Sequence, residues 1–355
     1  MSHHFSILDI EVKMIVLYIL LAILVFGIMI FVHELGHFAF AKIFKVSINE
    51  FSIGMGPKII SKKGKDGVLY ALRLFPIGGF VSMAGESEES DDPNAYDKKP
   101  AYQRFIIVIA GAVMNIVIAV IVVFFLSLTS PLFGTTTVAE FDNGEQVNQG
   151  LTVGDKIIEV DGNRVATYDE LSYEIMMNGD APVDILVIRN NERVLIEDYI
   201  FPTTNEEGIT YGQMNFYVMP EKRTFGSVMK NTFHTSVSTV KMIWDSIIGL
   251  ITGKFGFKQL SGPVGVTGAM VEVAQYGPRS FFYMVAVISM NLGVFNLLPI
   301  PALDGGTLLF TGIEMIFKKK VPRKVEDIVK IVGFVLLISL VVIVSIKDII
   351  SLIIF

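Results

Sequence analysis

The residues best suited to chemistry are two histidines and a glutamate inside one apolar segment. His33, Glu34 and His37 form the pattern His-Glu-Leu-Gly-His. In a helix, residues four positions apart lie on the same face, so both imidazoles can bind one metal ion, and the carboxylate between them is placed to activate a water molecule. Ionisable groups in a membrane segment are costly and usually functional. The alternative interpretation is a set of satisfied polar residues in a helix bundle.

A third protein ligand must be a histidine or a carboxylate, because the chain has no cysteine. The other histidines are poor candidates, since His3 and His4 precede any span and His234 lies in an amphipathic segment. Asp304 is the best carboxylate, because two prolines just before it interrupt an apolar stretch and expose backbone polar groups there. Considered alone, Asp304 would be expected to cap a helix as often as to bind a metal. The presence of the histidine pair favours its role as a metal ligand. This donor set suits zinc and also other divalent ions.

Four apolar stretches meet or approach the roughly 20 residues that a helix needs to cross a bilayer. They comprise residues 14–44, 105–128, 281–300 and 328–346. In the whole chain of 355 residues, 52% are hydrophobic and 18% are charged, and the excess lies in these stretches, which excludes a plain cytosolic enzyme and a disordered chain. The net charge of −6 excludes a generally basic nucleic-acid-binding protein. No small-residue cleavage site follows the first stretch, so we expect a retained helix rather than a signal peptide.

The charge of the connecting segments predicts the orientation, because positive short loops mark the cytoplasmic side of a membrane. Lys and Arg are enriched in residues 42–73 and 318–324, whereas residues 134–223 are acidic. We therefore expect both termini and the acidic segment outside and both basic loops inside. His33 lies about 28 Å along the first span at 1.5 Å per residue, and Asp304 ends the third span, so the metal site is expected near the cytoplasmic side.

Two segments next to the spans are predicted to lie at the membrane surface. Residues 69–82 alternate partly and turn at residues 76–79, which indicates a β-hairpin. Residues 227–252 carry apolar side chains at helical spacing together with Lys230, Lys241 and Asp245, which indicates an interfacial amphipathic helix.

The acidic external segment is predicted to form a β-rich domain. Residues 156–160 and 183–188 alternate as strands do, and residues 168–177 fit a helix. A resemblance to a PDZ domain rests on Gly150-Leu151, Gly154-Asp155-Lys156-Ile157-Ile158 and Asp161-Gly162. PDZ domains bind an extended peptide by adding it to a sheet edge. The alternative is a small β-rich domain without a peptide partner.

Together, the histidine motif, residues 296–305 and the PDZ-like insert resemble the site-2 protease family of zinc intramembrane metalloproteases. The nearest match is the bacterial branch that acts on membrane-anchored regulators of sigma factors. Residues 76–86, 110–115 and 261–265 resemble further family segments. The resemblance covers about residues 31–314 and implies a location in the bacterial cytoplasmic membrane.

The resemblance implies that His33, His37 and Asp304 bind Zn²⁺, that Glu34 is the catalytic base, and that Asn296 lies near the substrate or the oxyanion. It implies regulated intramembrane proteolysis of single-span membrane proteins that another protease has already shortened, such as anti-sigma factors or signal peptide remnants. The expected partners are these substrates and the lipid bilayer, with the PDZ-like domain contacting the substrate ectodomain and no nucleic acid bound. The predicted substrate contacts are Gly78, Gly79, Phe80, Val81, Asn291, Pro299 and Pro301. Asn115 is expected to be structural and to form an interhelical hydrogen bond, and such a bond is the alternative role for Asn291.

The sequence thus predicts a multi-pass α-helical membrane protein with about four transmembrane helices, a membrane-associated β-hairpin and an inserted β-rich PDZ-like domain. The predicted order is a first transmembrane helix (1–48), a cytoplasmic-side loop with a reentrant hairpin (49–104), a second transmembrane helix (105–130), the PDZ-like domain (131–203), a linker with the interfacial helix (204–280), a third transmembrane helix (281–317), and a basic loop with a fourth transmembrane helix (318–355). Two other functions compete. A metal transporter or sensor would not need Glu34 and usually shows internal repeats, and a PDZ scaffold would leave the membrane histidines unexplained.

Overall fold

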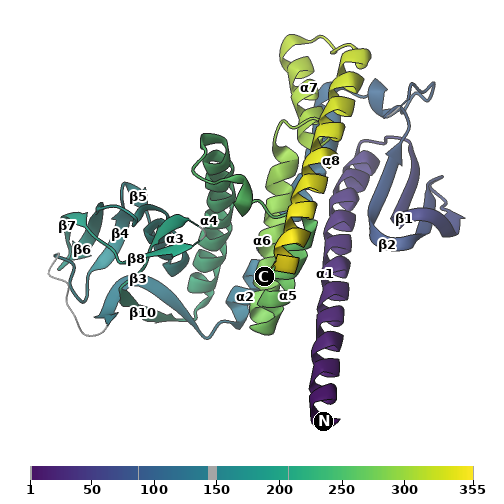
Figure 1. Cartoon of the computed structure of the whole chain (residues 1–355). Helices are drawn as coiled ribbons and strands as arrows, with labels where there is room; N and C mark the ends of the chain where they lie inside the picture. Colours follow the sequence, from purple (N-terminus) through teal and green to yellow (C-terminus); the bar gives the residue numbers. More distant parts are fainter. Residues whose placement is uncertain (1, 87, 143–149, 207, 355) are drawn as a thin grey trace. The chain divides into compact units, whose positions relative to one another are not determined.

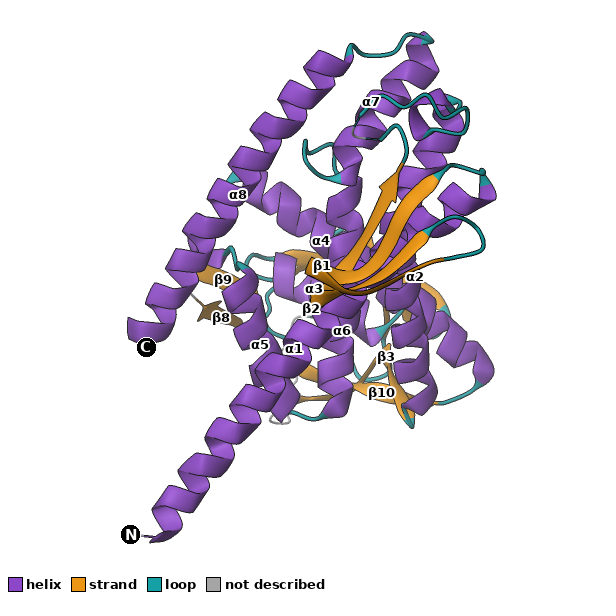
Figure 2. Ribbon diagram, turned by 90° about the vertical axis from the view of Figure 1, so that its right-hand side faces the viewer, coloured by secondary structure: helices purple, strands orange, loops and turns teal. Residues whose placement is uncertain are grey.

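The protein is represented by a computed structural model that describes residues 2–86, 88–142, 150–206 and 208–354 (Figures 1 and 2). The chain divides into two compact units. The first comprises Met1–Ala119 and Ile243–Phe355, and the second comprises Val120–Met242. All three predicted metal ligands belong to the first unit.

Within the described part of the chain, four helices are long and apolar enough to cross a membrane, which confirms the predicted multi-pass membrane protein at this level. They are α1 (Ser2–Ile43), α2 (Ala101–Thr129), α6 (Pro278–Leu297) and α8 (Arg323–Ile354). The candidate spans within them cover Val16–Ile43, Ala101–Thr129, Pro278–Leu297 and Arg323–Ser351.

The third predicted span, residues 281–317, is interrupted as its two prolines indicated. α6 ends at Leu297, and α7 (Asp304–Phe317) begins at Asp304. In the connection, the N–H of Ile300 donates to the carbonyl of Leu298 at 2.6 Å. Gly306 is needed here because a Cβ at this position would lie 2.9 Å from the carbonyl oxygen of Ile300. The break places the Asp304 carboxyl at the first residue of a helix.

One helix was missed by the prediction, which assigned residues 204–280 to a linker and one interfacial helix. Besides α4 (Phe225–Thr252), this region contains α5 (Pro263–Gln275), which starts with a proline at its first position. Asp348, buried near the end of α8, accepts the N–H groups of Gly262 and Gly265 at 2.8 and 2.9 Å. A carboxylate from the last helix therefore caps α5, a pairing over more than 80 residues that no local pattern reveals.

The predicted hairpin is part of a larger antiparallel arrangement of β1 (Ile48–Lys63) and β2 (Leu69–Met83) (Figure 2). Residues 50–53 of β1 pair with residues 69–72 and also with residues 79–82, so the two halves of β2 flank β1. The prediction of a hairpin confined to residues 69–82 was therefore incomplete, because the main partner of β2 is β1.

Glycines allow β2 to lie directly against α1. A Cβ on Gly78 would lie 2.9 Å from Cγ2 of Ile30, and a Cβ on Gly79 would lie 3.2 Å from Cβ of Glu34. Phe51 and Val81 are buried in a cluster that also contains Ile107 and Val108 of α2. This packing holds the strand beside the His-Glu-Leu-Gly-His motif.

The second unit contains a β-sheet with the strand order β10-β3-β4-β6-β7, to which β5 is added by pairing with β4. Its elements are β3 (Leu132–Phe141), β4 (Lys156–Val160), β5 (Asn163–Arg164), α3 (Tyr168–Asn178), β6 (Val183–Arg189), β7 (Glu192–Tyr199) and β10 (Phe216–Lys222), and a separate pair is formed by β8 (Thr203–Glu206) and β9 (Ile209–Gly212). The strands predicted over residues 156–160 and 183–188 and the helix predicted over residues 168–177 are confirmed.

An ion pair between Asp155 and Arg189 stabilises this sheet. Asp155 is fully buried, and Arg189 donates to both of its carboxylate oxygens at 2.7 Å. Burial raises the pKa of the Asp155 carboxyl, but hydrogen bonds from Arg189 and from the N–H of Thr152 outweigh that effect and hold the pKa below its ordinary value. The carboxylate therefore stays ionised and joins the start of β4 to the end of β6.

Strand β10 pairs antiparallel with β3 on the side opposite β4. The register joins Phe216 to Phe141 and Val218 to Val138. Of these four side chains, all but Val218 are buried in the core of the sheet.

The helix predicted as interfacial, α4, directs polar residues onto α3. His234 Nδ1 lies 2.9 Å from Glu170, Thr235 donates to Asp169 at 2.9 Å, and Lys241 pairs with Glu174. Lys241 therefore forms an ion pair with Glu174 within its own unit. The predicted position of Lys241 at the membrane surface did not indicate this pair. The interfacial position of α4 stays a prediction.

Candidate metal centre

The three predicted ligand residues converge on one point. His33 and His37 lie one turn apart on α1, and Asp304 begins α7. Oδ2 of Asp304 lies 3.0 Å from Nε2 of His33 and 3.2 Å from Nε2 of His37. The two Nε2 atoms are 3.1 Å apart. The helix-cap alternative for Asp304 is wrong in this structure, because the N-cap of α7 is Leu303 and no side chain caps the helix.

This triangle fits zinc. Tetrahedral zinc with nitrogen and oxygen ligands at about 2.0–2.1 Å requires ligand atoms about 3.3–3.4 Å apart, and the three observed separations are 3.0–3.2 Å. Oδ2 of Asp304 is buried, and among the described residues no donor makes a hydrogen bond to it. A cation between the three atoms would satisfy this oxygen and leave a fourth position for water.

Helix α2 orients both imidazoles through contacts with their Nδ1 atoms. Nδ1 of His37 donates to the carbonyl oxygen of Ile107 at 2.9 Å, which places the proton on Nδ1 and leaves the lone pair of Nε2 for a metal. Nδ1 of His33 lies 3.4 Å from the amide nitrogen of Asn115, whose Oδ1 is buried without a partner. Rotating that amide by 180° lets His33 donate to Oδ1, which satisfies both groups. The Asn115 side chain is thus directed at a predicted ligand.

Gly111 was not recognised in the sequence as part of the site. A Cβ at this position would lie 2.9 Å from Cε1 of His33 and would overlap the ring of His37. Gly36 meets the same helix, since its Cβ would overlap the carbonyl oxygen of Ala110. The sequence feature that could have identified Gly111 and Gly36 is their position in the middle of two apolar helices. Glycines at such positions permit close helix packing in membranes.

We expect Gly111→Ala to weaken zinc binding about 10- to 100-fold, in the range typical for groups that orient metal ligands. The added methyl group must displace one of the two imidazoles. Competition with a fluorescent zinc chelator measures the affinity. Gly312→Ala is the matched control, because a Cβ on this α7 glycine would meet no atom within 4 Å. Equal affinity of Gly111→Ala and wild type would contradict the packing described.

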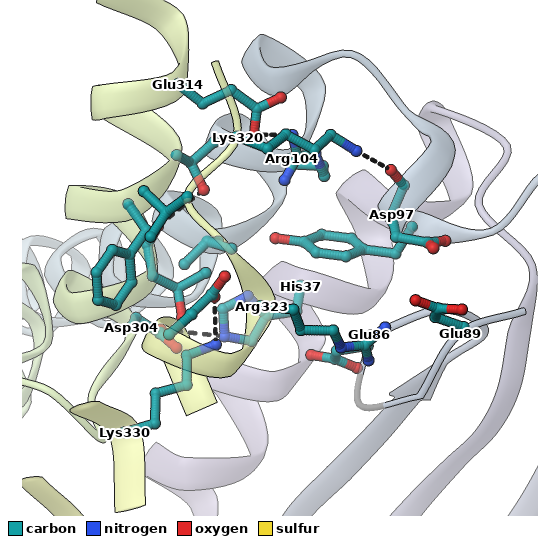
Figure 3. Close-up of a pocket in the computed structure, with 18 of the residues that line it drawn as sticks. His37, Glu86, Glu89, Asp97, Arg104, Asp304, Glu314, Lys320, Arg323 and Lys330 are labelled. Carbon is teal, nitrogen blue, oxygen red and sulfur yellow. Dashed lines mark hydrogen bonds and ion pairs between the residues drawn. The ribbon is translucent and has the colours of Figure 1, made fainter. Parts of the chain in front are cut away.

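Glu34 lies beside the metal ligands and is held by β2. Its Oε2 accepts the N–H of Val81 at 3.2 Å. Glu34, His37 and Asp304 all line a cavity of about 650 Å³ (Figure 3). Phe80 also lines it, and the Arg73 guanidinium stands 5.4 Å from the Phe80 ring. The predicted base and two of the metal ligands, His37 and Asp304, therefore share one chamber with the end of β2.

Other predicted site residues lie apart from this group. Asn296 is buried in the last turn of α6, and within the described chain no hydrogen bond joins it to Glu34 or the metal ligands. Asn291 and Pro299 are exposed and do not line the chamber. Pro301 packs against Gly333 of α8, where a Cβ would lie 2.8 Å from the Pro301 carbonyl carbon. Roles for these four residues stay predictions.

Comparisons with known proteins agree with this geometry. The chain matches the model of peptidase family M50 over residues 21–340. It is 36% identical over 335 residues to a Clostridium perfringens protein named as a zinc metalloprotease, covering 94% of this chain and 99% of the relative. It is 30% identical over 414 residues to the regulator of sigma-W protease RasP of Bacillus subtilis, covering 92% of this chain and 97% of the relative.

The match therefore includes both metal motifs and nearly the whole length of these relatives. The chain belongs to peptidase family M50 and is a zinc metalloprotease of the site-2 protease type.

Proposed function

We propose that the chain hydrolyses peptide bonds in or next to the transmembrane segment of single-span membrane proteins. The observation that carries the proposal is the position of the metal ligands. His33 and His37 lie within the candidate span Val16–Ile43, and Asp304 meets them from the break after the span Pro278–Leu297. A bond cleaved at this site must come to the depth of these helices.

In this mechanism, His33, His37 and Asp304 would hold the zinc ion. When bound, it would act as a Lewis acid for the scissile carbonyl and would lower the pKa of the attacking water towards neutral pH. Glu34 accepts the proton of the attacking water and returns it to the leaving amine. The proposed donor to the developing oxyanion is Asn296, from the last turn of α6.

We propose that the end of β2 holds the substrate in an extended conformation. A helical substrate hides its peptide bonds, so cleavage requires local unwinding. Val81 directs its N–H away from β1 and towards Glu34, so this edge of β2 faces the base. Strand addition along residues 78–81 would place an extended segment beside Glu34. The contacts of Asn291, Pro299 and Pro301 with substrate belong to the same proposal.

The proposed location is the bacterial cytoplasmic membrane, with the metal site near the cytoplasmic side and the second unit outside. This orientation is supported by the basic loops at residues 42–73 and 318–324 and by the acidic segment between them. The PDZ-like domain is proposed to contact substrate ectodomains. The name of the Bacillus subtilis relative refers to sigma-W regulation, which supports membrane-anchored regulators such as anti-sigma factors as substrates. Signal peptide remnants are the second substrate class of this proposal.

Purified protein in detergent micelles tests this proposal with a tagged single-span substrate. Mass spectrometry of the products should locate the cut in or beside the apolar segment. Chelation should stop the cleavage and added zinc should restore it. Cuts confined to soluble segments, or cleavage that persists without metal, would refute intramembrane proteolysis by this site.

A further inference from the structure

The chamber beside the metal site carries carboxylates that zinc chemistry does not use. Glu86, Glu89 and Asp97 line it from the segment between β2 and α2, and we refer to them as the acidic wall. Figure 3 shows these three side chains towards the right of the view and Asp304 on the left, and His37 lines the same chamber. The wall and the metal site therefore open into one continuous space.

The acidic wall has unused hydrogen-bonding capacity. Among the described residues, no ion pair involves the side chains of Glu86, Glu89 or Asp97, and Oδ1 of Asp97 is buried without a partner. Tyr96 lines the same chamber, is only 8% exposed, and its Oη is also buried without a partner. Because buried polar atoms are nearly always hydrogen-bonded, these atoms indicate a ligand with polar groups.

Most cations that line the chamber already have partners among its other lining residues. Arg104 pairs with Glu314 at 2.5 Å, and Lys330 pairs with Glu326 at 2.7 Å. Nζ of Lys320 donates to the main-chain oxygen of Asp97 at 2.8 Å. Arg323 keeps an unpartnered Nη2, a donor that fits a backbone carbonyl of a bound chain. The unpaired carboxylates thus determine which charged ligand side chains the chamber can accept.

We propose, building on the proposed protease function, that the acidic wall binds Lys or Arg side chains that flank the transmembrane segment of the substrate on its cytoplasmic side. Transmembrane segments carry such residues on that flank as a rule. When a bond near the end of the span lies at Glu34, the flanking residues enter the adjoining chamber. The wall is then a specificity determinant that positions the basic flank of the substrate.

Three substrates with the same tag and apolar span test this assignment. They differ only in three flanking residues, which are lysines, glutamines or glutamates, and assays in detergent micelles remove any effect of flank charge on membrane insertion. Wild type should cleave the lysine substrate with a kcat/KM about tenfold above that of the glutamine substrate, as expected for two partly exposed ion pairs. The double variant E86Q/E89Q should lose this preference, and E86K/E89K should prefer the glutamate substrate.

Glu88→Lys is the matched control, because Glu88 is exposed in the same segment but does not line the chamber. It should keep the preference of the wild type. An unchanged preference in E86Q/E89Q, or an equal reversal by Glu88→Lys through general charge attraction, would overturn the assignment.

Binding separates this inference from the proposed function. Fluorescence anisotropy with the Glu34→Gln protein reports affinity without cleavage. Tighter binding of the lysine substrate supports the acidic wall even if no enzyme cleaves any substrate, an outcome that would refute only the protease proposal. Equal binding of all three substrates refutes the wall and leaves the protease proposal standing.

Discussion

Glu34→Gln should lower kcat for cleavage of a single-span substrate by about 10²–10⁴-fold while the protein still binds zinc. The amide removes the group that accepts the proton of the attacking water, and general-base catalysis contributes about this factor. The local structure should persist, because the glutamine oxygen can still accept the N–H of Val81, as Glu34 does at 3.2 Å. Metal ligands are untouched by the substitution.

Single-turnover cleavage of a tagged substrate measures the chemical step, and elemental analysis measures bound zinc. Glu88→Gln serves as a control for loss of one negative charge, since this exposed residue lies outside the chamber. Loss of cleavage with zinc retained would separate the protease from a metal transporter or sensor. Undiminished cleavage by Glu34→Gln would show that another group is the base.

Asp304→Ala should remove zinc from the site and with it all cleavage. The substitution deletes the Asp304 Oδ2 atom, which lies within 3.2 Å of Nε2 of both imidazoles. Loss of a direct ligand should exceed the 10- to 100-fold loss in affinity that outer-shell partners typically cause. Because a bound metal stabilises the folded state by mass action, a chelator should lower the Tm of the wild type but not of Asp304→Ala.

Zinc content after dialysis and the melting temperature with and without chelator test this expectation. Asp327→Ala is the control, because this aspartate is exposed on α8 and does not line the chamber. It should behave as wild type in both measurements. A stoichiometric, chelator-sensitive zinc ion in Asp304→Ala would mean that the metal is held by other residues.

The parts of the site that are local in the sequence were predictable. The spacing of His33 and His37 places them on one helix face whatever surrounds them. The role of Asp304 as a ligand could be predicted by a different argument. A carboxylate after two prolines in an apolar stretch is rare, and the chain has no cysteine that could serve as the third ligand. The four apolar helices likewise follow from length and composition alone.

What escaped prediction depends on contacts between distant segments. The carbonyl of Ile107 and the N–H of Val81 are backbone groups present at every position, so nothing in the residue type marks them. Gly111 matters only because α2 crosses α1 at the two imidazoles. The pairing of β1 with both halves of β2 depends on the register between the strands, which the residue types of a single strand do not specify.

Strand β10 changes what the second unit can recognise. By pairing with β3, it closes an edge that would otherwise be open to foreign strands and so also guards against edge-to-edge aggregation. Along the main strand order of this sheet, β10-β3-β4-β6-β7, a visiting peptide can add outside the terminal strands β10 or β7, or by strand exchange with β10. Pro220 removes one backbone donor from β10, which makes its outer edge a poor template. Because α4 begins three residues after β10 ends, strand exchange would pull directly on that helix.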